Sequence, residues 1–292
     1  MPYLSVSPSP KRRIMELPYE LEREIFELTA RAHPKYAPQL ALVAGYVQTW
    51  VEAVIYETIV LGAPSEKQNL FWRTFSSRSP FFFSKNIRAL HLTTGVSYSH
   101  ARQIISICTN LSSLTCWANP LTSRDEFCAL LSPNLRRLSI NASILWSPTG
   151  PTTAPDLTHP LFARLTHLEV VNPPTWFDWA PLLDGALPNL TNLAFGDLDS
   201  LHASSMVDFF HAALASDAPR LQMLIAVSRD EHFLNSLQLA EIKDTRLVCL
   251  PSYHHPFSPP EYWDAVARRE IQFWQRQERL DPIDGVLTRK ER

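Results

Sequence analysis

One short leucine-containing segment recurs along most of the chain, and this repetition constrains the fold more than any other feature. Each copy has Asn or Arg, an apolar residue, two variable residues, Leu, one variable residue and a last apolar residue. The copies lie at residues 86–92, 110–116, 134–140, 164–170, 189–195 and 220–226, with a degraded seventh at 244–250. Their central leucines are separated by 24, 24, 30, 25 and 31 residues. Six copies in register indicate that one supersecondary unit is repeated.

Each copy predicts a strand, because apolar and variable positions alternate with a period of two. In the second copy, Leu114 and Cys116 are expected to point into the core, whereas Thr115 and Trp117 point outward. The segments between the strands carry helix signals. Residues 123–126 form a capping box, and residues 205–215 place several large apolar side chains on one helical face.

The pattern is similar to the L-x-x-L-x-L signature of leucine-rich repeats. This resemblance predicts an α/β fold, a leucine-rich-repeat solenoid of about six or seven irregular repeats over residues 62–255. Residues 256–292 are expected to add a capping helix and a tail, with Trp263 and Trp274 packed on the last repeat. The same spacing of strands and helices also fits a (β/α)₈ barrel. The solenoid is favoured because barrel strands have no reason to repeat this pattern.

The residues before the repeats predict a separate helical unit. Residues 1–15 are rich in Ser and Pro and are expected to be a disordered tail. Within residues 16–61, Leu21, Ile25 and Leu28 recur at helical spacing after a proline suited to the first turn. A second helical stretch is expected to begin near Pro38, so that the unit is a small pair or trio of helices. A unit of this size is marginally stable alone and needs a partner.

The sequence of this unit resembles an F-box. The first half is Leu17-Pro18-x-Glu20-Leu21, followed by Ile25-Phe26 and Ala30, and the second half runs from Leu40 to Trp50. Where the family usually has a basic stretch before the tryptophan, residues 44–50 contain no basic residue. An F-box followed by leucine-rich repeats is similar to F-box/leucine-rich-repeat substrate adaptors, above all the short F-box-like proteins of mushroom-forming fungi.

The resemblance implies a non-enzymatic adaptor that holds a protein substrate on a cullin-based ubiquitin ligase of the SCF type. In that family an apolar helical surface binds a Skp-type adaptor. Carried over to this chain, the adaptor-binding residues are Leu17, Pro18, Leu21, Ile25, Leu40, Leu42, Val43 and Trp50. The alternative for the same residues is a helical cap on the repeats. The protein would then be a leucine-rich-repeat interaction scaffold with a degenerate F-box and no role in ubiquitin transfer.

An unknown protein substrate is expected to bind the outward side of the strands. The candidate residues on this concave face are His91, Thr115, Trp117, Arg137, Asn141, His167 and Glu169. Trp117 is the strongest of them, because aromatic residues and arginine dominate binding hot spots. The alternative for Trp117 is packing under a neighbouring loop.

Composition argues against several other functions. With 27 basic and 29 acidic residues, the chain lacks the positive excess that nucleic-acid binding needs. Only seven glycines are present, and none forms a phosphate-binding or nucleophile-elbow motif. We predict no catalytic residues, no metal site and no cofactor. The His254–His255 pair is an unfavourable metal site, because adjacent residues rarely face one ion.

The cysteines and the chain ends indicate where such a protein is expected to act. Cys108, Cys116, Cys128 and Cys249 match no zinc-binding spacing and are expected to be small buried residues. The first fifteen residues lack the apolar stretch of a signal peptide, and no stretch is apolar enough to span a membrane. We therefore expect a cytoplasmic or nuclear protein without membrane partners.

Overall fold

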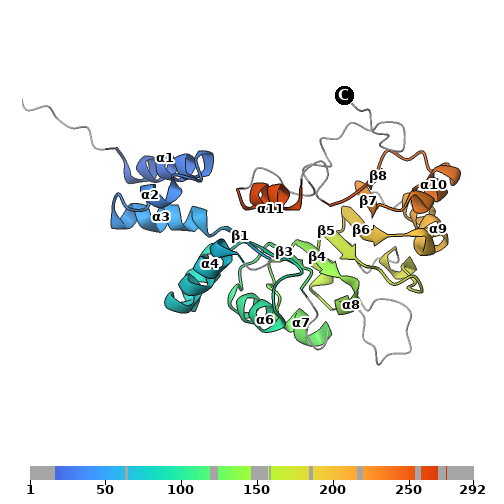
Figure 1. The fold of residues 1–292 in the computed structure, drawn as a ribbon, viewed down its shortest axis with the longest axis horizontal. Coiled ribbons are helices and arrows are strands. Elements are labelled where there is room, and N and C mark those ends of the chain that lie inside the picture. The colour runs from blue at the N-terminus through green and yellow to red at the C-terminus, as the bar shows by residue number, and fades with distance from the viewer. Residues whose placement is uncertain are drawn as a thin grey trace, which may run out of the picture. The chain divides into compact units, whose positions relative to one another are not determined.

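The repeated segments form the strands of one parallel sheet in the computed structural model (Figure 1). The structure describes residues 17–62, 65–118, 124–145, 157, 159–183, 187–215, 220–253, 258–268 and 274. The chain divides into two compact units, Met1–Ile55 and Tyr56–Arg292. The expected tail at residues 1–15, the capping-box serine at 123 and most of a Pro-rich stretch at 147–160 lie outside the described residues.

The first unit contains three helices, α1 (Tyr19–Ala32), α2 (Ala37–Leu40) and α3 (Gly45–Ile55). The second helical stretch of the sequence is therefore two helices, separated by a turn at residues 41–44. The core of this unit is apolar and is formed by Ala30, Ala37, Val47, Trp50, Val51 and Val54. Trp50 also packs edge-on against Tyr19, with ring centroids 4.7 Å apart. Burial of these residues joins α1 to α3.

The second unit contains a sheet in which every neighbouring pair of strands is parallel and the spatial order follows the sequence. Its strands are β1 (Thr58–Leu61), β2 (Ala89–Leu92), β3 (Ser113–Cys116), β4 (Arg137–Asn141), β5 (His167–Val171), β6 (Asn192–Leu198), β7 (Met223–Ser228) and β8 (Leu247–Leu250). Residues 58–61, which we expected in the helical unit, form β1 and pair with β2.

The central leucines of the repeat lie opposite one another across the sheet. Leu90 pairs with Leu114, Leu114 with Leu138, and the row continues through Leu168, Leu193 and Leu224. All six side chains are buried. The repeat therefore fixes the register, since a slip of one residue would move this row to the opposite face.

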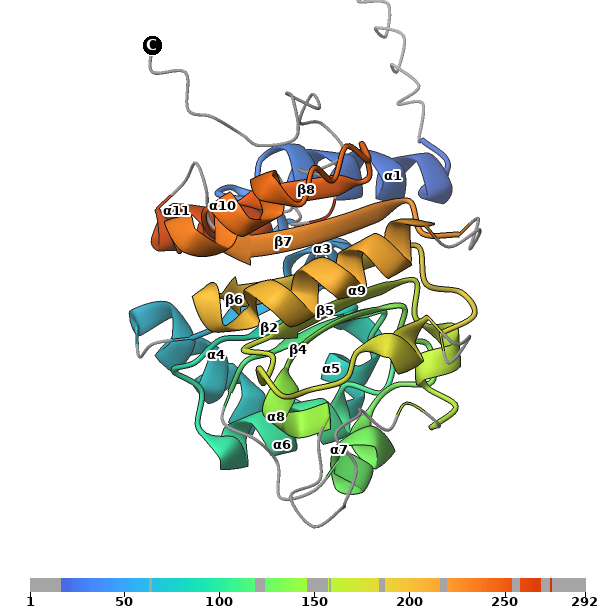
Figure 2. The same cartoon turned by 90° about the vertical axis from the view of Figure 1, so that its right-hand side faces the viewer.

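Helices and short 3₁₀ turns connect the strands and cover one face of the sheet (Figures 1 and 2). They are α4 (Glu66–Ser77), α5 (Pro80–Asn86), α6 (Tyr98–Ile107), α7 (Arg124–Leu130), α8 (Ala142–Leu145), η1 (Phe162–Arg164), η2 (Ala180–Leu182), η3 (Ser200–His202), α9 (Ala203–Ala215) and α10 (Glu231–Leu239). The main core lies between these helices and the sheet. All four cysteines are buried and none of them is in a disulfide, which confirms their interpretation as small core residues.

The expected leucine-rich-repeat solenoid is wrong, although a small helical unit does come before the sheet in the sequence. The structure is an α/β fold with one eight-stranded, all-parallel sheet whose strands alternate with helices, more like a Rossmann-type or TIM-type fold. The repeat specifies buried parallel strands and their register, and these are common to several parallel α/β folds. The likeness to a TIM-type fold lies in the alternation of parallel strands and helices. The sheet itself is not closed into a barrel within the described residues, because β1 pairs only with β2 and β8 only with β7.

The covering of the two sheet faces explains why the prediction of a solenoid failed. A solenoid would leave the outward side chains on an open surface, whereas this sheet is covered on both sides, as parallel sheets usually are. Helix α11 (Pro259–Ala267) lies across from the connecting helices (Figure 1). It contacts β1, although we expected it to cover the last repeat. Its predicted capping box is confirmed: the backbone N–H of Ser258 donates to the Glu261 carboxylate over 3.0 Å.

Candidate functional site

A row of polar side chains crosses the second face of the sheet, beneath the C-terminal segment. His91 lies opposite Thr115, Thr115 opposite Ser139, and Ser139 opposite Glu169 on β2 to β5. Thr115, Ser139 and Glu169 are buried, and Glu169 is only 3% exposed. One residue from each of four adjacent strands therefore brings polar groups into the interior of the second unit.

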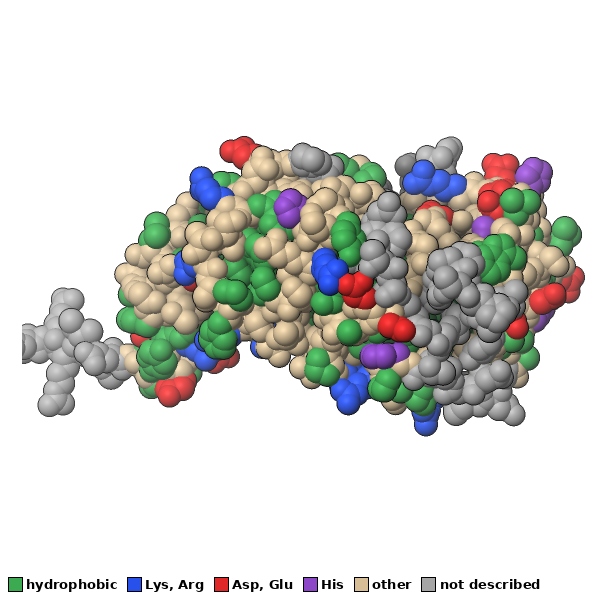
Figure 3. All heavy atoms as spheres, turned by 90° about the horizontal axis from the view of Figure 1, so that it is seen from below, with side chains coloured by type: hydrophobic (Ala, Val, Ile, Leu, Met, Phe, Trp, Pro, Cys, Tyr) green, Lys and Arg blue, Asp and Glu red, His purple; other side chains and the backbone are tan. Residues whose placement is uncertain are grey.

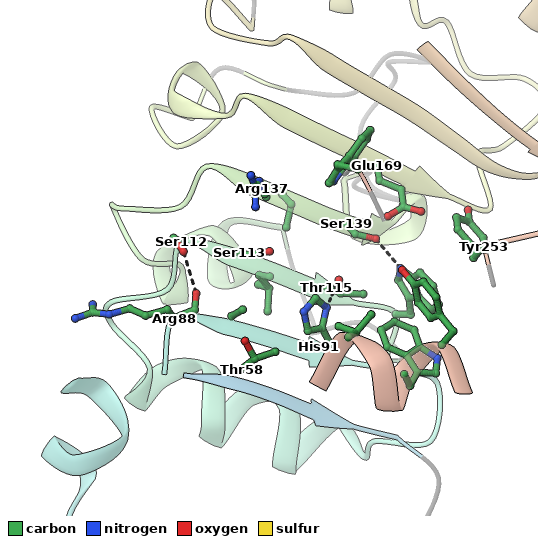
Figure 4. A pocket seen from close by; sticks show the side chains of 18 of the residues that line it. Thr58, Arg88, His91, Ser112, Ser113, Thr115, Arg137, Ser139, Glu169 and Tyr253 are labelled. Atoms are coloured by element: carbon green, nitrogen blue, oxygen red, sulfur yellow. Dashed lines mark hydrogen bonds between the residues drawn. The ribbon is translucent and has the colours of Figure 1, made fainter. Parts of the chain in front are cut away.

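This row lines a cavity of about 150 Å³ between the sheet and α11 (Figure 4). The polar wall comes from the four strand residues. The opposite wall is aromatic and includes Tyr253, Tyr262, Trp263 and Trp274. In Figure 4, the side chains of Ser139, Glu169 and Tyr253 point toward one another.

Hydrogen bonds fix most of the row. His91 Nδ1 lies 2.9 Å from Thr115 Oγ1. The indole Nε1–H of Trp117 donates to Ser139 Oγ over 2.7 Å. The Ser139 side chain also lies close enough to Glu169 to lower the pKa of its carboxyl group. Trp117 is thus hydrogen-bonded to Ser139, which lies opposite the buried carboxyl group of Glu169 on the next strand.

The buried carboxyl group of Glu169 does not use all of its hydrogen-bonding capacity. Among the described residues, its Oε1 has no hydrogen-bond partner. Burial raises the pKa of Glu169 to about 8, and the nearby Asp197 carboxylate raises it further, while the hydrogen bond from Ser139 opposes the rise. Removal of a carboxylate from water disfavours its charged form. The group is therefore mainly neutral near pH 7 in the structure as it stands.

Aromatic rings close the cavity on the side of α11. Trp117 lies between Tyr253 and Trp263, with ring centroids 5.1 and 5.5 Å away. Tyr253 packs directly on β6 at Gly196, where a Cβ atom would stand 1.0 Å from the tyrosine oxygen. A glycine inside a strand commonly marks such a close approach. Gly196 therefore permits the tyrosine to reach the sheet.

A second cavity of about 350 Å³ lies near the carboxyl ends of the strands and shares Trp117, Tyr253 and Trp263 with the first. Its lining includes Asn172 and Asp197, which adopt positive φ angles of 54° and 58°. Non-glycine residues rarely adopt this conformation, and Asn and Asp tolerate it best. In open parallel sheets, ligands bind outside the carboxyl ends of the strands. The second cavity occupies that position.

The structure gathers most of the residues predicted on the outward face. His91, Thr115, Trp117, Arg137 and Glu169 line the first cavity, and Asn141 lines the second. His167 lies beside them and packs against Trp274, with ring centroids 5.1 Å apart. Burial and the nearby Arg137 lower the pKa of His167 to about 4, and burial lowers that of His91 to about 4. These residues form an enclosed site, whereas we expected an open concave surface.

The sequence interpretation missed Tyr253 and Tyr262 and assigned Trp263 and Trp274 to packing on the last repeat. One signal for Tyr253 was present, because Gly196 directly follows the apolar run Leu193–Phe195. No comparable signal marks Tyr262, whose position depends on contacts between segments far apart in the sequence.

The first unit presents a second candidate surface. Leu21 and Ile25 on α1 are 48% and 51% exposed, and Leu28 is exposed beside them. Leu17, Pro18, Leu42 and Val43 are exposed as well. Of the eight residues predicted to bind a Skp-type adaptor, only Leu40 and Trp50 face the core of the unit. We call Leu17, Pro18, Leu21, Ile25, Leu28, Leu42 and Val43 the exposed apolar surface.

Other site types find no support in the described part of the chain. No group of three or more His, Cys, Asp or Glu side chains there is placed to hold a metal ion. Every described helix falls short of the length and hydrophobicity that a membrane span requires. On the face shown in Figure 3, basic and acidic side chains are interspersed.

We compared the chain with protein-family models, with characterised proteins and with solved structures, and none of them matches it.

Proposed function

We propose that this protein is a non-enzymatic adaptor subunit of a cullin-based ubiquitin ligase of the SCF type. In this proposal the helical unit binds a Skp-type adaptor, and the sheet unit binds a protein substrate. The observation that carries the proposal is the exposed apolar surface. Leu21, Ile25 and Leu28 are neighbours at helical spacing on α1, and neighbouring exposed apolar side chains mark interaction sites, because their contact with water is unfavourable.

In the helical unit, the exposed apolar residues of α1 lie on a different side from the residues that pack the core. Trp50 is 5% exposed and packs with Tyr19 and Tyr46. Leu21, Ile25 and Leu28 recur on another side of α1, away from the buried Ala30. The F-box resemblance assigns adaptor binding to several residues of this same surface. A partner is therefore proposed to bind α1 and the α2–α3 turn without disturbing the core.

A protein partner such as a Skp-type adaptor fits the chemistry of the exposed apolar surface. Its apolar side chains favour an apolar partner groove over nucleic acid, which would need basic residues. Cullin-based ligases act in the cytoplasm and the nucleus, and we place this adaptor there.

The experiment is co-expression with a Skp-type adaptor, followed by affinity purification and measurement of the dissociation constant. The variant Leu17→Asp/Ile25→Asp places charges at two exposed positions and should abolish binding while the unit stays folded. Arg23→Gln is the matched control, because Arg23 is exposed on α1 but lies on another side of the helix. Binding by the wild type and the control, with loss in the double variant, supports the proposal. A folded wild-type protein that does not bind would contradict it and leave an interaction protein without a role in ubiquitin transfer.

A further inference from the structure

The cavity around Glu169 combines two features that rarely occur together in an apolar core. One is a buried carboxyl group with an unused oxygen, and the other is a wall of aromatic rings. Buried polar atoms are almost always hydrogen-bonded, so each exception needs a physical explanation. A buried acceptor without a donor destabilises the isolated protein.

We propose that this cavity is a binding site for an alkylammonium group, with Glu169 as the anion that accepts its N–H and with Trp117, Tyr253 and Trp263 around its cationic head. A cation placed over aromatic rings is attracted by the negative faces of their π systems. The proposal rests on the second unit alone and does not depend on whether the helical unit binds a Skp-type adaptor.

The geometry of the cavity favours a cation over a neutral ligand. The Trp117 and Trp263 rings are inclined by 74° with centroids 5.5 Å apart, so they present surfaces in different directions. The free Oε1 belongs to the only buried carboxyl group among the described residues. A bound ammonium would donate to that oxygen and supply the positive charge that the buried carboxylate lacks. Among the described residues, Glu169 has no ion-pair partner of its own.

The charged and titratable neighbours are compatible with this assignment. His91 and His167 have pKa values lowered to about 4, so both are neutral above pH 6. Burial raises the pKa of Tyr253 well above its usual value, which keeps this phenol neutral. Asp197 adds negative charge, while Arg137 acts on His167 and is not among the groups that shift Glu169.

The remaining groups on this wall are Arg88 and Glu57 at the β1–β2 side and Tyr262 on α11. Glu169 is therefore the group whose charge changes when an ammonium enters between pH 6 and pH 8. Since the carboxyl group is mainly neutral in the empty cavity, binding must expel its proton to the solvent. One ammonium enters, one carboxylate forms, and one proton leaves.

The test uses the full chain and butylammonium chloride as the probe, with 1-butanol as the uncharged probe of similar length. Isothermal titration calorimetry at pH 6.5, in buffers with different ionisation enthalpies, measures proton release directly. We expect saturable binding, release of close to one proton and a higher affinity at pH 8 than at pH 6.5. Butanol should bind much more weakly.

The variant Glu169→Gln keeps the shape of the side chain and cannot ionise. It should lower the affinity for butylammonium by about thirtyfold or more at pH 8, and it should abolish proton release. Glu231→Gln is the matched control, because Glu231 is an exposed carboxylate on α10 in the same unit. It should bind as the wild type does. Circular dichroism and thermal unfolding check that both variants are folded.

A second experiment distinguishes two sources of an alkylammonium group, a free amine and a lysine of a protein partner. The tripeptide Gly-Lys-Gly presents the same group on a polypeptide. Tighter binding of the peptide than of butylammonium assigns the site to a lysine of a protein partner, and weaker binding assigns it to a free amine. Both results support the site. Absence of butylammonium binding, equal binding of butanol, or unchanged affinity in Glu169→Gln would overturn the proposal.

Discussion

The helical unit keeps leucine and isoleucine side chains in contact with solvent, whereas the sheet encloses a carboxyl group, two hydroxyl groups and an imidazole. On α1 the exposed residues are Leu21, Ile25 and Leu28. On β5 the 3% exposed residue is Glu169. An exposed apolar surface and a buried, incompletely satisfied polar group both raise the free energy of the isolated protein. From this comparison we infer that departures from ordinary burial, in either direction, point to the surfaces where partners are proposed to bind.

The two regions should respond differently to substitution. Changes in the exposed apolar surface should alter partner binding and leave stability unchanged. Changes around Glu169 should alter stability as well, because this site is part of the packing of the second sheet face.

The largest effect on stability is expected from Gly196→Ala. Its new Cβ would overlap the Tyr253 oxygen, so the tyrosine must leave its position on β6. We expect a loss of about 3 kcal/mol in the free energy of unfolding, measured with chemical denaturant.

In a Tyr253→Ala background the substitution Gly196→Ala should cost much less, because the clash is gone. Gly45→Ala is the control, since nothing lies within 4 Å of its added Cβ. Equal stability of Gly196→Ala and the wild type would contradict the packing of Tyr253 on this strand.

The next largest effect concerns pH. The folded chain holds the Glu169 proton up to about pH 8, whereas the unfolded chain loses it near the usual value of 4.5. Stability therefore falls as the pH rises through this range. His91 acts in the opposite direction between about pH 4 and 6.5, because its folded-state pKa is lowered.

Above pH 6.5, of these two groups only Glu169 still changes the stability with pH. We expect the free energy of unfolding of the wild type to fall by about 2 kcal/mol between pH 6.5 and 8. Glu169→Gln should remove this loss, and the exposed-site control Glu24→Gln should retain it. Denaturant titrations at several pH values provide the measurement. A loss of the same size in Glu169→Gln would show that another group is responsible.

A smaller effect is expected from Trp117→Phe. Phenylalanine keeps an aromatic ring but cannot donate to Ser139 Oγ, which Trp117 Nε1 contacts at 2.7 Å. We expect a loss of about 1–2 kcal/mol in the free energy of unfolding. Trp176→Phe is the control, because Trp176 is an exposed tryptophan of the same unit. Equal losses in the two variants would mean that the hydrogen bond to Ser139 contributes nothing.

The smallest effect is expected from Leu42→Gln on the exposed apolar surface. Leu42 is 83% exposed, so this change should alter the free energy of unfolding by less than about 0.5 kcal/mol. The buried Val47→Gln in the same unit should cost about 3 kcal/mol, because it places an amide in an apolar core. Thermal and denaturant unfolding check both. Similar losses in the two variants would place Leu42 in the core and weaken the proposal of a docking surface.

The sequence predicted the strands and their register well, because central leucines such as Leu114 and Leu138 mark the same buried row in each copy. It missed β1, whose residues 58–61 lack the repeated pattern. The prediction of an open outward face failed at Thr115 and Glu169, which are buried. Period-two alternation shows that these residues share a face, but it carries no information on whether a distant segment covers that face.

Only part of the candidate site was predicted, because strand periodicity does not show which distant segment covers the sheet. His91, Trp117 and Glu169 were identified from their positions on the strands, whereas Tyr253 and Tyr262 come from the segment that covers them. The ring contact between Tyr253 and Trp117 joins residues more than a hundred positions apart, and no local pattern encodes such a distance. In the helical unit, the spacing of Leu21 and Ile25 predicted a helix, and only the structure shows that this stripe faces solvent.

The central claim is that the protein carries two separate binding surfaces, and a two-by-two binding measurement tests it most directly. Leu17→Asp/Ile25→Asp and Glu169→Gln are each titrated with a Skp-type adaptor and with butylammonium. The account predicts that the first variant loses the adaptor and keeps the amine, and that the second loses the amine and keeps the adaptor. If either folded variant lost both ligands, or kept both, the claim of two independent surfaces would be contradicted.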